Sequence, residues 1–545
     1  MRDGHGMRVR QSSVRNPQGK IRRHAHWLLL LWTLALPGGR SACAASCEGL
    51  ASLELPDTTI TSAVSVTPPY RTDALPFFPP VEVTVPFCRV AATLTPTRDS
   101  NIKIEVWLPL AASWNEKFAG VGNAGLGGSI LTAYMVPDLV RGYVTAATDT
   151  GHDNSGAPGA FALGHPEKVI DYGYRSTHLT AVAGKAIAEK FYGRAAQHAY
   201  FSGCSQGGQE AMMEAQRFPA DYDGIIAGDP DYYQTHHEVG AHLWMMAALF
   251  GNPAGAIPPS KASLVGHAVN EACDALDGVR DGVLEDPRQC RFDPGVLQCK
   301  GADSPDCLTA PQVEAIRKIW EGPSKATGLC RLQGPGYYPG LERGGEADTW
   351  ARWIATDSPE TNLHGYLGMP FFKYFVFADP NWNFRAFDYK VDPARVEKKL
   401  AAALDATDPN LEPFARRGGK LIHYHGYSDP DIPPRASILY YESVIKALGG
   451  RAKVNAFYRL FMVPGMGHCF GGPGASSFDT LTALERWVEQ GAAPETLVAT
   501  KYADTANPSR GIIRTHPLCS YPATAHYVGT GSTDEAQNFV CRLNP

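Results

Sequence analysis

A serine in a glycine-flanked motif carries the clearest chemistry in this sequence. Ser205 lies at the centre of Gly203-Cys204-Ser205-Gln206-Gly207, which fits the pattern Gly-x-Ser-x-Gly. In that pattern the serine occupies a sharp turn between a strand and a helix, which exposes its hydroxyl as a nucleophile. A serine hydroxyl is a weak nucleophile until a base takes its proton, so a histidine and an acid are needed as well. The motif therefore predicts acyl transfer, provided that these partners are present.

Two later loops offer the acid and the base. Asp429 follows an apolar segment that begins at Lys420, and His468 follows a second apolar segment and a Pro-Gly turn. The chain order serine, acid, histidine is that of α/β-hydrolases. Asp431 is a rival acid, and we favour Asp429 because it comes directly after the expected strand. Each residue also has a structural interpretation, since Asp429 could cap the next helix and His468 could be a hydrogen-bonded loop residue.

Segments with the character of strands precede all three candidates. Residues 198–202 form a short apolar run, and residues 208–218 have the composition and spacing of a helix. This is the strand, turn and helix arrangement that the serine motif requires. All three candidate residues are therefore predicted at strand ends. His423 and His425 lie within the expected strand before Asp429, and we interpret both as structural.

The motifs GCSQGG, YHGYSD and VPGMGHCFGG together resemble those of the tannase and feruloyl esterase family of α/β-hydrolases. The resemblance extends from about residue 47 to the end of the chain and includes the segment RFPADYDGIIAGDP. It implies an α/β fold with an α/β-hydrolase core, a mostly parallel sheet flanked by helices, and a large inserted lid domain. It also implies that Ser205 is the nucleophile, His468 the general base and acid, and Asp429 the group that orients the histidine.

An oxyanion hole must also supply two hydrogen-bond donors. The serine motif predicts that one is the backbone N–H of Gln206, the residue after the nucleophile. The family resemblance places the other at Gly125, within the glycine-rich segment 120–128. That segment lacks the Lys-Ser/Thr of a phosphate-binding loop, so we expect no nucleotide there.

Cysteines stand directly beside two of the catalytic candidates, since Cys204 precedes Ser205 and Cys469 follows His468. By the family's pattern, disulfides would join Cys47 to Cys88, Cys204 to Cys469, Cys273 to Cys290, Cys299 to Cys307, and Cys519 to Cys541. Cys330 is then left over. The Cys204–Cys469 bond would tie nucleophile to base and, in the chain-entropy model, contribute on the order of 5 kcal/mol.

An acidic, glycine-containing turn lies between Cys273 and Cys290. Carboxylates and backbone carbonyls are the oxygen ligands that calcium prefers, although this spacing does not match an EF-hand loop. Composition alone leaves a solvated acidic turn equally open. The family resemblance implies a structural Ca²⁺ site made by the carboxylates of Asp274, Asp277 and Asp281 and the main-chain carbonyls of Val279 and Val283. No organic cofactor is expected.

The first 45 residues have the order of a secretory signal peptide. Basic residues precede the apolar run Trp27–Leu36 and the small-residue segment Ala42–Ala45, and the run is too short to span a bilayer. Met7 is an alternative start, and a lipoprotein signal at Cys43 is disfavoured by Arg40, where an aliphatic residue would be needed. We therefore predict a secreted or periplasmic protein without a membrane anchor.

The chain of 545 residues is longer than one ordinary domain. The predicted organisation is a signal peptide (1–45), a first part of the hydrolase core (46–235), a lid domain with the calcium site (236–399) and a second part of the core (400–545). The net charge of −5 offers no basis for a nucleic-acid partner.

Aromatic residues are dense in the segment 366–384 of the predicted lid. They favour an aromatic acyl group, although single rings could simply fill the lid's own core. We predict a secreted serine carboxylesterase for small-molecule esters of aromatic acids, free or attached to plant polysaccharide, with feruloyl and other hydroxycinnamoyl esters favoured and galloyl esters second. Other aryl-ester, amide or lactone hydrolysis stays open, as does a catalytically inactive, calcium-stabilised binding protein on the same fold.

Overall fold

The computed structural model describes residues 45–545, except 76–77, 154, 324–338, 506 and 544–545. Residues 1–44 of the predicted signal peptide, including Cys43, lie outside the described residues, and so does Cys330. Among the residues that are described, no helix combines the length and the apolar character that crossing a membrane would need.

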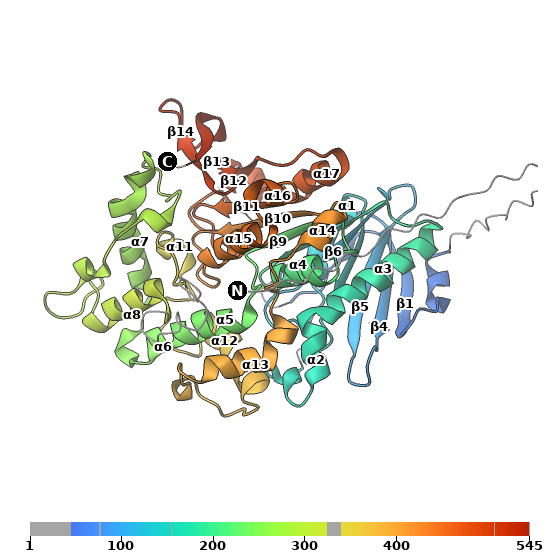
Figure 1. Ribbon diagram of the computed structural model, residues 1–545, viewed down its shortest axis with the longest axis horizontal. Coiled ribbons are helices and arrows are strands. Elements are labelled where there is room, and N and C mark those ends of the chain that lie inside the picture. The colour runs from blue at the N-terminus through green and yellow to red at the C-terminus, as the bar shows by residue number, and fades with distance from the viewer. Residues whose placement is uncertain (1–44, 76–77, 154, 324–338, 506, 544–545) are drawn as a thin grey trace, which may run out of the picture. The chain divides into compact units, whose positions relative to one another are not determined.

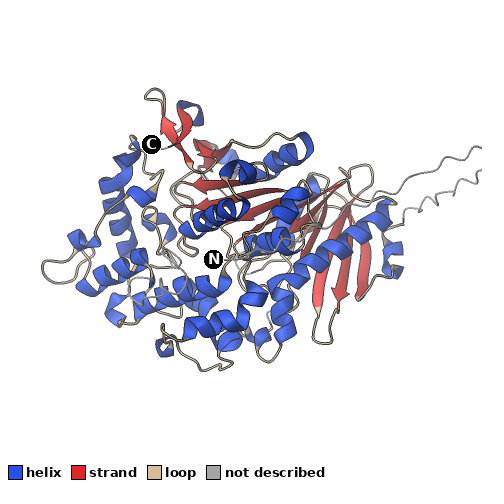
Figure 2. Cartoon of the chain, in the orientation of Figure 1, coloured by secondary structure: helices blue, strands red, loops and turns tan. Residues whose placement is uncertain are grey.

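Among the described residues, nine strands form one large sheet (Figure 2). In chain order they are β1 (Thr58–Val66), β4 (Phe87–Leu94), β5 (Ile102–Pro109), β6 (Lys117–Val121), β7 (Val144–Thr148), β8 (His198–Cys204), β9 (Gly224–Gly228), β10 (Lys420–Gly426) and β11 (Tyr458–Val463). Their order across the sheet is β1-β4-β5-β7-β6-β8-β9-β10-β11. The strands from β1 to β7 in that order pair antiparallel, whereas the six from β7 to β11 pair parallel.

Helices cover both faces of the parallel part. Side chains alternate along a strand, so neighbouring residues enter different cores. Ile225 of β9 packs into one core with residues of α3 (Ser176–Tyr192) and α4 (Gln206–Arg217), whereas Ile226 packs into another with α17 (Thr480–Gln490). Every residue of β9 and β11 is buried, as expected of strands that are covered on both sides. The predicted α/β-hydrolase core is confirmed.

The segment between β9 and β10 contains helices but no strand element among its described residues. Its longer helices are α6 (Trp244–Phe250), α7 (Pro259–Cys273), α8 (Ala310–Glu321), α12 (Leu363–Pro370) and α13 (Asp392–Leu404), which run from green to orange in Figure 1. They enclose a hydrophobic core of their own that includes Val265, Ile316 and Phe371. The predicted lid, 236–399, lies within this helical segment.

The aromatic segment 366–384 mainly builds that core. Phe371, Phe372 and Phe375 are fully buried. Trp382 stacks on Phe372 with ring centroids 5.3 Å apart. Packing inside the lid therefore accounts for these rings, and their density is not by itself a sign of a substrate slot.

The described cysteines form five disulfides, in the pairs that the family resemblance implied: Cys47–Cys88, Cys204–Cys469, Cys273–Cys290, Cys299–Cys307 and Cys519–Cys541. The last joins two small antiparallel pairs near the C-terminus. These are β12 (Thr496–Tyr502) with β13 (Ile512–Cys519), and β14 (Ala523–Tyr527) with β15 (Phe539–Leu543).

Candidate active site

Four neighbouring parallel strands each end in a residue of the candidate site. Ser205 follows β8, Asp229 follows β9, Asp429 lies in the loop after β10, and His468 lies in the loop after β11. In open α/β sheets, side chains at the carboxyl ends of neighbouring strands face a common region, which is where such folds bind ligands. The arrangement explains how residues so far apart in the sequence gather in one place.

Ser205 occupies the predicted turn between β8 and α4. Its backbone has φ 63° and ψ −122°, a conformation that residues other than glycine rarely adopt. The Ser205 N–H donates to the Gly228 carbonyl at 3.0 Å, and the Ser205 carbonyl accepts from the Gln209 N–H at 3.0 Å. These bonds hold the strained turn that presents the hydroxyl.

Close packing around this turn requires glycine. A Cβ at Gly203 would collide with the carbonyl of Gly207, and a Cβ at Gly122 would lie 2.6 Å from the Gly207 Cα. The segment after β6 can therefore approach the serine turn, and the Gly207 N–H donates to the Asn123 carbonyl at 2.9 Å.

The imidazole of His468 is held by a buried carboxylate. Its Nδ1 lies 2.9 Å from Oδ2 of Asp429, and the other oxygen of Asp429 accepts the N–H groups of Asp431 and Ile432 at 2.8 and 3.0 Å. This is the relation that keeps a catalytic histidine in one tautomer. The rival acid, Asp431, lies instead on the Nε2 side, with Oδ2 at 3.6 Å.

No described hydrogen bond joins the Ser205 hydroxyl to His468. Catalytic hydrogen bonds commonly tighten only when substrate binds. The two residues are nevertheless tied covalently, because Cys204 and Cys469 form a disulfide with their Cα atoms 6.0 Å apart.

Asp229 is a residue of the site that sequence reasoning missed. It is fully buried, and it accepts the Gly426 N–H at 2.6 Å through Oδ1 and the Cys469 N–H at 2.8 Å through Oδ2. It therefore ties the acid-bearing loop to the histidine-bearing loop. Its place directly after the apolar run Gly224–Gly228 was the signal that could have identified it.

Charges around the imidazole favour its protonated form. Burial alone would lower the pKa of His468, but the carboxylates of Asp429, Asp431 and Asp229 raise that pKa above its ordinary value. Burial alone would raise the pKa of Asp429, but His468 and His425 hold it below its ordinary value. The site thus stabilises the imidazolium that forms when a histidine takes the proton of a serine.

His425 has a larger place in the site than the sequence suggested. Its Nε2 lies 3.3 Å from Oδ2 of Asp429, and its Nδ1 lies 2.6 Å from Oγ of Ser437. His425 and His468 thus both approach Oδ2 of Asp429. His423 instead bonds to Tyr458 and Ser437 inside the core.

Both predicted oxyanion donors have an N–H that donates to no other described residue, namely Gln206 and Gly125. Tyr172, which the sequence analysis did not single out, links the two segments. Its hydroxyl lies 2.8 Å from the side-chain oxygen of Gln206 and 3.2 Å from the carbonyl of Gly125. Because the backbone N–H groups of Gln206 and Gly125 donate to no described residue, they are available to a ligand.

Residues of the lid border this site. A Cβ at Gly125 would lie 3.4 Å from Cδ2 of Leu367 in α12. The ring of Trp353, half-buried, lies edge-on to the His468 ring with centroids 5.8 Å apart. Trp353 is thus an aromatic side chain beside the candidate base, and it lies outside the aromatic segment on which the sequence prediction relied.

The acidic turn surrounds a small cavity of about 10 Å³. Four of the five predicted calcium ligands line it, together with Glu285, which the sequence analysis did not name: Asp277, Val279, Asp281, Val283 and Glu285. The fifth, Asp274, does not line the cavity, and its carboxylate accepts the Gly282 N–H at 3.1 Å. Burial, with repulsion from Asp281 and Glu285, raises the pKa of Asp277 to about 6.

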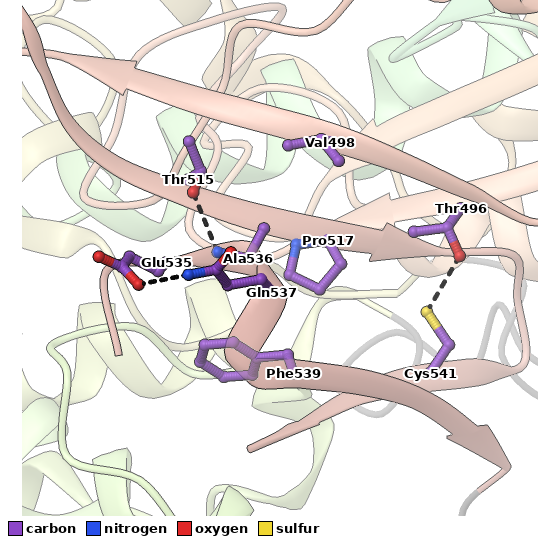
Figure 3. A pocket seen from close by; sticks show the side chains of 9 residues that line it. All are labelled: Thr496, Val498, Thr515, Pro517, Glu535, Ala536, Gln537, Phe539 and Cys541. Carbon is purple, nitrogen blue, oxygen red and sulfur yellow. Dashed lines mark hydrogen bonds between the residues drawn. The ribbon is translucent and has the colours of Figure 1, made fainter. Parts of the chain in front are cut away.

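A larger hollow of about 560 Å³ lies elsewhere, between β12, β13 and the C-terminal segment (Figure 3). Its walls include Thr496, Pro517 and Phe539. It contains none of the candidate triad, oxyanion or calcium residues, so size alone is a poor guide to the site in this protein.

A serine on a strained turn after a central strand, with a histidine and an aspartate at neighbouring strand ends, defines an enzyme of the α/β-hydrolase type. Residues 88–542 match the family described as "Tannase and feruloyl esterase". The chain belongs to this family and is a carboxylic ester hydrolase of it.

Relatives span most of the chain. An uncharacterized esterase of Xanthomonas campestris pv. campestris is 40% identical over 95% of this chain and 95% of its own length. A mono(2-hydroxyethyl) terephthalate hydrolase of Piscinibacter sakaiensis is 35% identical over 81% of this chain and 82% of its own. The crystal structure of feruloyl esterase B from Aspergillus oryzae superposes with a TM-score of 0.79 and 26% identity, covering 91% of this chain and 99% of that one.

Proposed function

We propose that this protein is a serine esterase that hydrolyses esters of aromatic acids, with feruloyl and other hydroxycinnamoyl esters preferred. The observation that carries the proposal is the arrangement of Ser205, Asp429 and His468 at the ends of neighbouring strands, with the Asp429–His468 contact of 2.9 Å. The likeness to a feruloyl esterase over almost the whole of that structure supports the substrate class.

The residues imply a two-step reaction through an acyl-enzyme. His468 takes the hydroxyl proton as the Ser205 oxygen attacks the ester carbonyl carbon, and the negative oxygen that results is held by the N–H groups of Gln206 and Gly125. When the carbon–oxygen bond to the alcohol breaks, His468 returns the proton to the departing alcohol. Water then attacks the carbonyl carbon of the acyl-enzyme as His468 takes its proton. His468 returns that proton to the Ser205 oxygen when the bond to the acyl group breaks and the free acid leaves.

The lid supports an aromatic acyl group through Trp353 rather than through the buried aromatic segment. Trp353 lies edge-on to the His468 ring, with centroids 5.8 Å apart, so it offers an aromatic surface beside the candidate base. Leu367 adds apolar surface beside Gly125. Flat rings bind such walls by stacking and by burying area.

Four esters test this proposal: methyl ferulate, methyl gallate, mono(2-hydroxyethyl) terephthalate and p-nitrophenyl acetate. We expect rapid turnover of the ferulate ester, with loss in Ser205→Ala and retention in Ser155→Ala, an exposed serine outside the site. Preference for the gallate ester would make the protein a tannase. Turnover of the acetate alone would remove the aromatic assignment, and no turnover would favour the inactive binding protein.

The acidic turn suits a structural calcium ion. The carboxylates of Asp277, Asp281 and Glu285 and the carbonyls of Val279 and Val283 line one cavity, and all are hard oxygen donors. Here we propose Glu285 in place of Asp274. Burial and mutual repulsion disfavour the charged form of these carboxylates. The ion would neutralise that charge.

Export is also part of the proposal. Five disulfides are typical of an oxidising compartment, and the signal-peptide pattern of the first 45 residues agrees with this. Mass spectrometry of the N-terminus of protein recovered from culture medium or periplasm would test it. A chain that retained its first 45 residues in the cytoplasm would contradict it.

A further inference from the structure

A buried cluster of histidines and carboxylates lies beside the active site, and the proposed esterase mechanism does not use it. We name it the Asp431 cluster, and it consists of Asp231, His237, Glu238, His242, His364 and Asp431. The histidines come from α5 (Gln234–His237), the π-helical turn Glu238–Leu243 and α12, whereas Asp431 follows β10. Each of these six side chains is at most 8% exposed.

Three imidazole nitrogens converge on one carboxylate oxygen. Oδ1 of Asp431 lies 2.9 Å from Nε2 of His242, 3.6 Å from Nε2 of His237 and 3.7 Å from Nδ1 of His364. Zinc binds nitrogen and oxygen at about 2.0–2.2 Å, so the ligands of a tetrahedral ion are separated by about 3.4 Å. The three observed distances scatter around that separation. Ligand atoms of His237, His242 and Asp431 lie within 4.8 Å of one another, and His364 is outside this group.

The opposite nitrogens of two of these rings lie close to further carboxylates. Nδ1 of His237 lies 3.0 Å from Oδ1 of Asp231, and Nδ1 of His242 lies 2.9 Å from Oε2 of Glu238. A histidine that binds a metal typically donates its other N–H to a carboxylate, which fixes the tautomer and aims the free nitrogen at the ion. His242 has this arrangement, with Nε2 toward Oδ1 of Asp431. Nδ1 of His237 lies near Asp231 without a hydrogen bond to it, and its Nε2 lies 3.3 Å from the main-chain oxygen of Asp431.

His364 supplies an independent indication that a ligand belongs here. Its side chain is fully buried, and neither of its ring nitrogens has a hydrogen-bond partner. Buried polar groups almost always have a partner, so an imidazole in this state needs an explanation. A water bound to an ion that the neighbouring side chains hold would provide one.

We propose that His237, His242 and Asp431 bind one divalent transition-metal ion, of which zinc best suits two imidazoles and a carboxylate. Soft sulfur ligands are absent from the set and imidazole dominates it, which favours such an ion over calcium. A cavity of about 60 Å³ lined by Asp231, His237 and Ile432 adjoins the cluster and offers a route of entry.

Three protein ligands leave the fourth position of a tetrahedral ion to a water, to which the buried ring of His364 could hydrogen-bond. The ion would join α5 and the turn Glu238–Leu243 to the loop that carries Asp429. Because the other oxygen of Asp431 lies 3.6 Å from Nε2 of His468, the metal site and the active site share one carboxylate. The inference does not depend on the proposed substrate.

The experiment uses the mature protein, purified without a histidine tag and stripped with a chelator. Isothermal titration with Zn²⁺ in excess Ca²⁺ should show one site, Co²⁺ should give the visible absorption of a tetrahedral complex, and Zn²⁺ should raise Tm. His237→Ala and His242→Ala should each lower Zn²⁺ affinity at least tenfold. Two matched controls, Asp277→Asn in the acidic turn and His526→Gln in β14, should bind Zn²⁺ as the wild type does.

The wild-type titration tests metal binding by the Asp431 cluster even if a variant fails to fold. Less than one equivalent of Zn²⁺, or no change in Tm and no Co²⁺ spectrum, would overturn the proposal and leave the cluster as histidine–carboxylate ion pairs. Equal binding by folded His242→Ala would also overturn it. Since no substrate is involved, failure here is distinct from failure of the esterase assignment.

Discussion

The active site and the acidic turn both gather carboxylates on loops closed by a disulfide, but they balance the negative charge differently. Asp429 lies between two imidazoles and accepts two backbone N–H groups, and its pKa falls. Asp277 makes no ion pair with any described residue, faces Asp281 and Glu285, and its pKa rises to about 6. The first region balances its charge with its own side chains. In the second, Arg514 lies 3.6 Å from Asp281 and His516 lies 2.9 Å from Glu285, and the proposed calcium ion would balance Asp277.

The disulfides at the active site and at the acidic turn differ in the length of chain that they close. Cys204–Cys469 joins residues 265 positions apart and connects two catalytic loops, whereas Cys273–Cys290 joins residues 17 apart and closes one turn. In the chain-entropy model the longer loop contributes more, on the order of 5 kcal/mol against about 3 kcal/mol. The disulfide at the active site therefore connects distant parts of the fold, whereas the disulfide at the acidic turn closes a local segment.

The largest expected effect separates the two acids of the active site. Asp429→Asn should lower kcat about 10⁴-fold, because an amide at this position favours the wrong tautomer of His468. Asp431→Asn removes a carboxylate from the Nε2 side and should cost less than about tenfold. Steady-state kinetics on methyl ferulate, with circular dichroism to verify folding, measures both. A larger loss for Asp431→Asn would reverse the assignment of the acid.

The next effect concerns the covalent clamp. Replacing Cys204 and Cys469 together by alanine should lower the free energy of unfolding by up to about 5 kcal/mol and also reduce kcat, because the serine and histidine loops lose their tether. The matched control replaces Cys299 and Cys307, which are 8 positions apart, and should cost less and leave kcat unchanged. Equal losses of stability would show that loop length does not decide the contribution.

Much of the site could be predicted from sequence because its signals are local. The serine turn depends on Gly203 and Gly207, and adjacent residues in the sequence determine the sharp change from strand to helix. The order of serine, acid and histidine is likewise visible in the chain. These features arise from backbone geometry that few other sequences satisfy.

Other residues were missed because only the assembled sheet gives them meaning. Asp229 bonds to two loops that begin about 200 positions later, and nothing near it in sequence indicates this. Trp353 lies outside the aromatic segment that drew attention, whereas Phe371 and Phe372 proved to be core. Composition measures how many rings a lid has, but not which of them faces the base.

Removing calcium should affect stability but not chemistry. A chelator should lower Tm by a few degrees, since an ion present at 100 times its Kd contributes about 2.7 kcal/mol. Asp277→Asn should abolish the response, because this carboxylate lines the cavity, whereas Asp274→Asn should retain most of it. Differential scanning calorimetry with and without Ca²⁺ measures both. If Asp274→Asn lost more of the calcium effect on Tm than Asp277→Asn, the ligand set implied by the family resemblance would be supported instead.

The smallest effect is a shift in pH dependence. His468 must be neutral to take the serine proton, and neighbouring carboxylates outweigh burial to raise its pKa. Activity should therefore be present above that pKa and be lost as pH falls through it, so the acidic limb of kcat/KM should lie above the ordinary imidazole value of about 6.5. Chelation of calcium should lower Tm without moving this limb, because the acidic turn makes no contact with the imidazole among the described residues. A limb that moved with calcium would show that the two regions are coupled after all.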